Sequence, residues 1–106
     1  MNKKTVIVSA GIAGLLMIAA GNVSAADGAA LYKAKACHTC HGADGKTPLL
    51  PTYPKIAGQN VEYLIQQVKD IRDGKRTNGM SAAMKPMAAQ ATDDDIKAIA
   101  EWLASQ

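Results

Sequence analysis

Aromatic side chains are scarce in this sequence of 106 residues, which contains no phenylalanine. Only one tryptophan and three tyrosines are present, and no segment alternates apolar and polar residues as a half-buried strand does. The absence of such alternation argues against a β-sheet and leaves helices. A chain this short also has little apolar surface to bury, and domains of this size commonly depend on a staple or a cofactor. We therefore predict an all-α domain with a core that side chains alone fill poorly.

Cysteine and histidine are scarce as well. The chain has two of each, all between residues 37 and 41. A structural zinc ion takes four ligands around it, and five consecutive residues cannot surround an ion in that way. A thioredoxin-like redox pair usually follows a strand in a βαβ unit, whereas the residues before Cys37 predict a helix. A zinc site is therefore excluded, and a redox dithiol remains the weaker alternative.

The order of these residues, Cys37, His38, Thr39, Cys40 and His41, is the C-x-x-C-H pattern of c-type haem attachment. Two thiols three positions apart on one helical turn point the same way, so each can add to one vinyl group of a haem. His41 is then held beneath the iron, where a neutral imidazole can bind as the proximal ligand. We therefore predict one covalent haem c, which would also fill the centre of a small core.

The N-terminal segment has the features of a secretory signal peptide. Lys3 and Lys4 give it a positive start, residues 6–20 are apolar, and small residues lead up to Ala25. The apolar run is shorter than the roughly 20 residues that span a bilayer as a helix, although an uncleaved anchor remains the alternative. We predict a signal peptide at residues 1–25, cleaved after Ala25 or Ala26, and export to the periplasm.

Removal of this segment changes the charge of the chain. Without Lys3 and Lys4, ten basic residues face nine acidic ones, so the mature chain is near neutral. Two haem propionates would make it slightly negative. The basic character of the whole sequence is therefore no argument for nucleic-acid binding, and after cleavage no stable membrane span is expected.

Helix caps and apolar periodicity predict three main helices. Asp27 is placed as the N-cap of a first helix that runs up to Cys37. Asn60 caps a helix over residues 61–73, which Gly74 ends. Thr92 caps the last helix, with three aspartates in its first turn. The apolar stripes of the last two helices, which we expect to be buried, are Val61, Leu64, Ile65, Val68 and Ile71, and Ile96, Ile99, Trp102 and Leu103.

The segments outside these three helices differ in composition, and residues 42–58 are predicted to be a loop. Residues 42–58 contain three prolines and several glycines, and so long a loop in a small domain usually has a function. We expect it to enclose one edge of the haem. Residues 77–91 show no sustained periodicity. The cations at the end of the middle helix suit its dipole and are expected to face solvent: Lys69, Arg72, Lys75 and Arg76.

The second axial ligand of the iron has to come from elsewhere in the chain. His38 lies inside the attachment turn and cannot reach the opposite haem face. Three methionines, Met80, Met84 and Met87, fall within eight positions of one another, and a methionine thioether is a known haem ligand. Methionines also fill gaps in cores, and spacing alone does not choose among the three.

The chain resembles a class I bacterial cytochrome c of the small monohaem type, and it is similar also to one half of a periplasmic dihaem cytochrome c. The resemblance covers residues 26–106, which we interpret as a cytochrome c domain with loops wrapped around one haem. It is carried by Gly28, Leu31, Tyr32, the Cys37 to His41 motif, Gly42, residues 54–59, Tyr63, Leu64, Gly74, Lys75, Arg76, the Met84 region and the last helix.

This resemblance implies roles for particular residues. The axial methionine of the family stands eight positions before the cap of the last helix, which selects Met84, with Met87 second. The carbonyl of Pro54 would accept a hydrogen bond from the outer ring nitrogen of His41, fixing its tautomer. Gly28 would let the first helix cross the last one closely, near Trp102.

A haem closed by His41 and a methionine has no vacant position, which disfavours substrate chemistry at the iron. We therefore expect an electron carrier and not an enzyme, although the chain could serve as a subunit of one. It would be a monomer that meets larger redox proteins, its donor and acceptor, through small, brief interfaces. The alternative is a haem enzyme subunit or a ligand sensor with an open or exchangeable sixth position.

Overall fold

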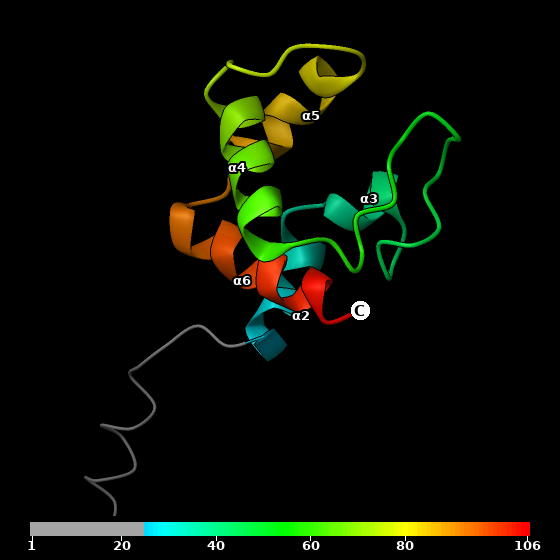
Figure 1. Ribbon diagram of the computed structural model, residues 1–106, viewed down its shortest axis with the longest axis vertical. Coiled ribbons are helices and arrows are strands. Elements are labelled where there is room, and N and C mark those ends of the chain that lie inside the picture. Colours follow the sequence, from blue (N-terminus) through cyan, green and yellow to red (C-terminus); the bar gives the residue numbers. More distant parts are fainter. Residues whose placement is uncertain (1–24) are drawn as a thin grey trace, which may run out of the picture.

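The computed structural model describes residues 25–106, and this range contains five helices and no strand (Figure 1). The all-α prediction is confirmed for these residues. The signal peptide predicted for residues 1–25 lies outside the described residues except for Ala25. None of the helices in the described range has the length and apolar character that a membrane span requires. The five helices are α2 (Ala25–Ala34), α3 (Cys37–His41), α4 (Val61–Arg72), α5 (Ser81–Ala88) and α6 (Asp93–Ala104).

The ends of α4 and α6 are set by the caps that the sequence predicts. The side chain of Asn60 accepts a hydrogen bond from the backbone N–H of Tyr63 at 3.0 Å, which satisfies a free donor in the first turn. Thr92 and Asp95 form a reciprocal capping box at the start of α6. Gly74, with a φ of 79°, follows the end of α4. Both helices therefore begin and end close to the predicted positions.

Helices α2 and α6 cross closely, and their contact forms the base of the core (Figure 1). A Cβ atom on Gly28 would lie 2.2 Å from the carbonyl oxygen of Ala98 and 2.8 Å from Cβ of Trp102. Only glycine fits at that crossing. The rings of Tyr32 and Trp102 pack beside it with centroids 5.0 Å apart. The buried cluster that results comprises Tyr32, Leu64, Ile99, Ala100 and Leu103.

Two segments differ from the predictions. Helix α5 lies in the 77–91 segment, which lacks sustained periodicity and was not among the three main helices predicted, and it contains Pro86. That proline removes one backbone donor and lowers the local helix propensity. Packing against α4 stabilises this two-turn helix, which neither its length nor its pattern would do alone. No part of its sequence signals that contact.

The first helix, α2, also differs from its prediction. It begins at Ala25, so Asp27 lies inside its first turn and is not the N-cap. A carboxylate there still suits the positive end of the helix dipole. The helix ends at Ala34 and does not reach Cys37, because Ala36 adopts a left-handed conformation with φ 64° and turns the chain into α3.

The loop that follows α3 is irregular, as predicted, and backbone hydrogen bonds fix it at several points. The carbonyl of Gly45 accepts from the N–H groups of Ile56 and Ala57 at 2.9 and 3.2 Å. The N–H of Leu49 donates to the carbonyl of Cys40 at 2.9 Å, and that of Gly58 donates to Leu103 at 2.8 Å. The loop is therefore tied to α3 at one end and to the last turn of α6 at the other.

Candidate haem-attachment site

Helix α3 presents two free thiols, Cys37 and Cys40, three positions apart. Both are partly buried, and Cys37 packs against the buried cluster that includes Tyr32 and Leu64. Burial raises the pKa of the Cys37 thiol to about 11, so this group is protonated at neutral pH. The two sulfur atoms lie on one short helix, as a pair of thioether bonds to one porphyrin requires.

The histidine that ends α3 has one ring nitrogen engaged. His41 is 8% exposed, and its Nδ1 atom lies 3.0 Å from the carbonyl oxygen of Pro54. A carbonyl can only accept, so Nδ1 carries the proton and Nε2 is left with a lone pair. Such a carbonyl partner is the usual arrangement behind a histidine that binds a metal, because it fixes the tautomer and the ring orientation.

A buried tyrosine holds the backbone directly after this histidine. The hydroxyl of Tyr32, which is 0% exposed, donates to the carbonyl of Gly42 at 2.6 Å. Burial raises the pKa of Tyr32 above its ordinary value, so the hydroxyl remains a donor over the physiological range. Gly42 has a φ of 89°, and a Cβ atom there would lie 2.3 Å from the carbonyl oxygen of Thr47. The segment bearing His41 is thus fixed from both sides.

The three methionines take different positions around α5. Met80 precedes the helix and is 53% exposed. Met84 and Met87 are half-buried and, being three positions apart on α5, lie on one face of it. Burial therefore distinguishes Met84 and Met87 from Met80, but it does not separate these two from each other.

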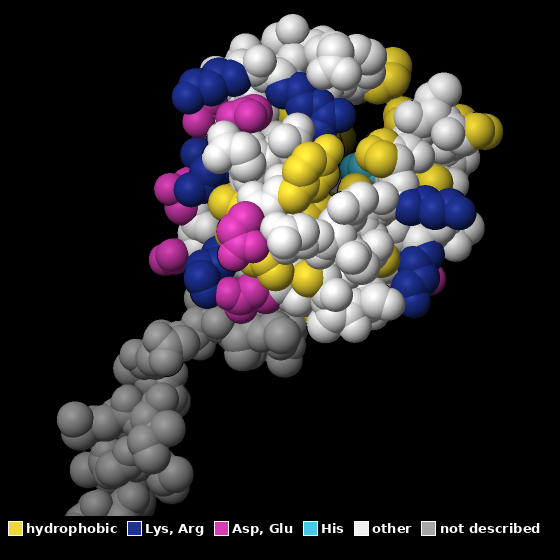
Figure 2. All heavy atoms as spheres, viewed as in Figure 1, with side chains coloured by type: hydrophobic (Ala, Val, Ile, Leu, Met, Phe, Trp, Pro, Cys, Tyr) yellow, Lys and Arg dark blue, Asp and Glu magenta, His cyan; other side chains and the backbone are white. Residues whose placement is uncertain are grey.

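A recess opens on the face of the molecule that Figure 2 shows. Figure 2 shows a histidine side chain within it and hydrophobic side chains around its rim. The large hydrophobic residues that remain exposed come from the loop, from α4 and from the approach to α5: Leu49 (68%), Leu50 (43%), Tyr63 (52%) and Met80 (53%).

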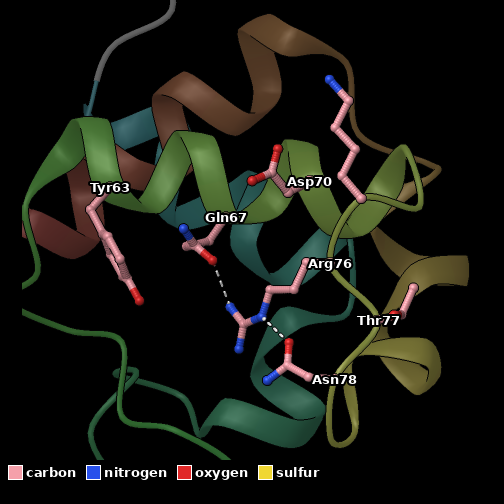
Figure 3. Close-up of a pocket in the computed structure, with 7 residues that line it drawn as sticks. Tyr63, Gln67, Asp70, Arg76, Thr77 and Asn78 are labelled. Carbon is pink, nitrogen blue, oxygen red and sulfur yellow. Dashed lines mark hydrogen bonds between the residues drawn. The ribbon is translucent and has the colours of Figure 1, made fainter.

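A separate, polar pocket of about 580 Å³ lies between α4 and the segment that follows it (Figure 3). It is lined by Tyr63, Gln67, Asp70, Lys75, Arg76, Thr77 and Asn78. The sequence indicated solvent for both Lys75 and Arg76, but Arg76 is half-buried and faces this pocket. The fold of the segment after α4 causes the difference, and no local pattern signals it.

These observations fit a haem. Two thiols on one turn suit its vinyl groups, an imidazole with its outer nitrogen engaged suits its iron, and apolar side chains suit its faces. Comparison with known proteins supports the same conclusion, because a model of the family described as cytochrome C oxidase, cbb3-type, subunit III, matches residues 23–103. The chain belongs to the cytochrome c family.

The chain has close relatives among named cytochromes c. Over 108 residues the chain is 42% identical to cytochrome c4 of Pseudomonas aeruginosa, covering 100% of this chain and 49% of that protein. Over 70 residues it is 46% identical to cytochrome c-554(548) of Halomonas halodenitrificans, covering 66% of this chain and 83% of that protein. The chain therefore spans about half the length of its cytochrome c4 relative.

A solved structure agrees with these relatives. Cytochrome c4 of Acidithiobacillus ferrooxidans superposes with a TM-score of 0.68 and 30% sequence identity, over 80% of this chain and 51% of that one. Membership in the cytochrome c family implies covalently bound haem c, and the segment from Cys37 to His41 fits one such group. The expected class I cytochrome c fold and cofactor are therefore confirmed.

Proposed function

We propose that this chain is an electron carrier in which Cys37 and Cys40 hold one haem c, and His41 and Met84 are the axial ligands of its iron. The observation that carries the proposal is the contact of His41 Nδ1 with Pro54 at 3.0 Å, beside two free thiols. In the neutral ring it leaves Nε2 with a lone pair, which would bind the haem iron.

The haem supplies a one-electron redox couple when bound. The thiols of Cys37 and Cys40 would hold the haem, and a methionine would supply the second ligand of its iron. Pro54 and Tyr32 restrain the segment bearing His41. A closed coordination shell favours electron transfer over substrate chemistry. A thioether also raises the potential relative to a second histidine, so we expect a positive potential.

The proposed function also includes a location in the cell and redox partners. We infer from the signal peptide predicted at residues 1–25 that the mature domain, residues 26–106, is exported to the periplasm. A relative from Stutzerimonas stutzeri, 37% identical over 101 residues, is named thiosulfate dehydrogenase electron acceptor. We infer that this chain likewise receives electrons from a larger redox protein during brief contacts and passes them to another.

Optical spectra of protein prepared from a periplasmic extract test this proposal. The oxidised wild-type protein should show the weak long-wavelength band of methionine-bound ferric haem, and the reduced protein should show a c-type spectrum. Met84→Ala should abolish the weak band and lower the midpoint potential by on the order of 0.1 V or more. Met87→Ala, a change of the same size on the same helix, should leave both unchanged.

The other outcomes each overturn a named part of the proposal. Loss of the band in Met87→Ala alone would make Met87 the ligand. A c-type spectrum without the band in the wild type would favour the enzyme subunit or ligand sensor with an open position. Colourless protein would leave the redox dithiol as the better explanation, and absence from the periplasmic extract would contradict export.

A further inference from the structure

The loop between α3 and α4 carries two leucines that the fold leaves in water. Residues 48–51 read Pro-Leu-Leu-Pro, and Leu49 and Leu50 are 68% and 43% exposed. Neither leucine is among the residues that form or flank the buried cluster of the core. Figure 1 shows this loop at the outer side of the molecule, beyond α3. The apolar area of the leucine pair is therefore still available for burial against something else.

A lysine lies on each side of the leucine pair. Lys46 precedes it and Lys55 follows it, and both are exposed. Neither makes an ion pair within 4.0 Å in the described range 25–106, where the paired cations are Lys35, Lys69, Arg72 and Lys97. Residues 46–55 contain no acidic residue, and the carboxylate of the neighbouring Asp44 accepts from the backbone N–H of Lys46 at 2.8 Å. The turn thus combines an apolar centre with positive charge on both flanks.

The backbone of this turn has few polar groups that need water. Three of the seven residues 48–54 are prolines, which have no N–H. The N–H of Leu49 donates to the carbonyl of Cys40 at 2.9 Å, and that of Tyr53 donates to the carbonyl of Leu50 at 3.0 Å. Only two of the seven residues therefore keep an N–H without a partner in the described part of the chain. Because unpaired backbone groups make it costly to remove a loop from water, the cost for this loop is low.

These features together fit a lipid surface. A segment that binds at the membrane interface places apolar side chains at the boundary between headgroups and acyl chains, and its lysines attract anionic headgroups. A protein partner would offer fixed acceptors to the backbone of a loop, which this turn has few donors to use. We propose that Leu49 and Leu50 insert into the surface of an anionic bilayer, with Lys46 and Lys55 at the headgroup phosphates.

This contact would orient the haem-attachment helix relative to the membrane. The N–H of Leu49 donates to Cys40 at the end of α3, so the inserted turn and the cysteine pair are directly connected. A carrier held in this way meets membrane-bound proteins by diffusion along the surface. The inference goes beyond the proposed electron transfer and does not depend on which residues bind the iron.

Co-sedimentation of the holoprotein with lipid vesicles tests the proposal. One set of vesicles contains phosphatidylcholine alone, and the other contains phosphatidylcholine mixed with phosphatidylglycerol. The protein in the pellet is measured on a gel, so the result does not depend on the haem. The wild type should bind the anionic vesicles at least about fivefold more tightly than the neutral ones, and added salt should weaken the binding because it screens the lysines.

Variants with matched controls assign the binding to the loop. Leu49→Ser should weaken binding to the anionic vesicles about tenfold, because part of the buried apolar area is lost. Its control is Tyr63→Ser, which alters a side chain of α4 that is 52% exposed. Lys46→Gln should weaken binding about fivefold. Its control is Lys33→Gln, which removes an exposed charge from α2. Both controls should bind like the wild type.

Several results would overturn the inference. Failure of the wild type to bind anionic vesicles at low salt would leave a protein partner as the better explanation of the exposed turn. Equal losses in Leu49→Ser and Tyr63→Ser would show that the binding is not specific to the loop. Self-association of the wild type that Leu49→Ser abolishes, measured by sedimentation velocity without lipid, would make a second copy of the chain the partner. If Leu49→Ser does not fold, Leu50→Ser replaces it and should weaken vesicle binding in the same way.

Discussion

The crossing of α2 and α6 can be tested with the single substitution Gly28→Ala, for which two effects have opposite signs. Alanine is a better helix former than glycine by about 0.5–1 kcal/mol, which would stabilise α2. The added Cβ would lie 2.2 Å from the carbonyl oxygen of Ala98, well inside van der Waals contact. That oxygen belongs to a helix backbone, so no rotamer change can relieve the overlap.

The steric effect should be the larger of the two. Overpacking of a core typically costs about 1–3 kcal/mol and more when backbone has to move. We therefore expect Gly28→Ala to lower the free energy of unfolding by about 2 kcal/mol after the gain in helix propensity is included. Because Tyr32 lies one turn further along α2, the displacement should also reach its hydrogen bond to Gly42 and weaken the methionine-to-iron band.

Urea unfolding of the holoprotein, followed by far-ultraviolet circular dichroism, measures this change. Ala30→Gly is the matched control, because Ala30 is exposed on the same helix and its replacement reports helix propensity alone. The control should lose about 0.5–1 kcal/mol. A Gly28→Ala protein that is as stable as the wild type, or more stable, would contradict the close crossing.

Two further predictions concern the ends of helices. Ala36→Gly should raise the free energy of unfolding by about 0.5–1 kcal/mol in the same assay, because relief of the left-handed conformation exceeds the added entropy of the unfolded chain; a loss equal to that of Ala30→Gly would contradict this. The hydrogen bond from the N–H of Thr92 lowers the pKa of Asp95. The contribution of this hydrogen bond to the free energy of unfolding is therefore complete above the unfolded pKa of roughly 3.9, and it is lost as pH falls through the folded value. Unfolding measured from pH 6 down to roughly pH 2 should show a shallower decline in Asp95→Asn than in the wild type, and equal slopes would argue against the cap.

Local sequence signals predict the fold best where caps and periodicity agree. Asn60 and Thr92 mark the starts of α4 and α6 because their side chains satisfy backbone donors within the next turn. Helix α5 could not be predicted in this way, since Pro86 opposes a helix and the stabilising contact comes from α4. The break at Ala36 was missed for a similar reason, because alanine normally continues a helix and only tertiary structure imposes a positive φ.

The residues of the site also differ in whether a local sequence pattern predicts them. The spacing of Cys37, Cys40 and His41 specifies its chemistry within five residues, so the sequence suffices to find it. The contact of His41 with Pro54 spans 13 positions and was expected only through the family resemblance. The orientation of Arg76 depends on Gln67, which lies nine positions earlier on α4. When only the fold brings two residues together, no local sequence pattern predicts their contact.

The attachment of the long loop to the end of α6 has a consequence for the order of events during maturation. His41 precedes Leu103 by about sixty residues in the sequence, and Gly58 ties the loop after His41 to Leu103. Closure therefore waits for the final turn of the last helix. In the closed protein the buried Cys37 thiol has a pKa of about 11 and forms little of the reactive thiolate. Both thiols are therefore most accessible before Leu103 packs against the loop, and haem attachment should precede the completion of folding.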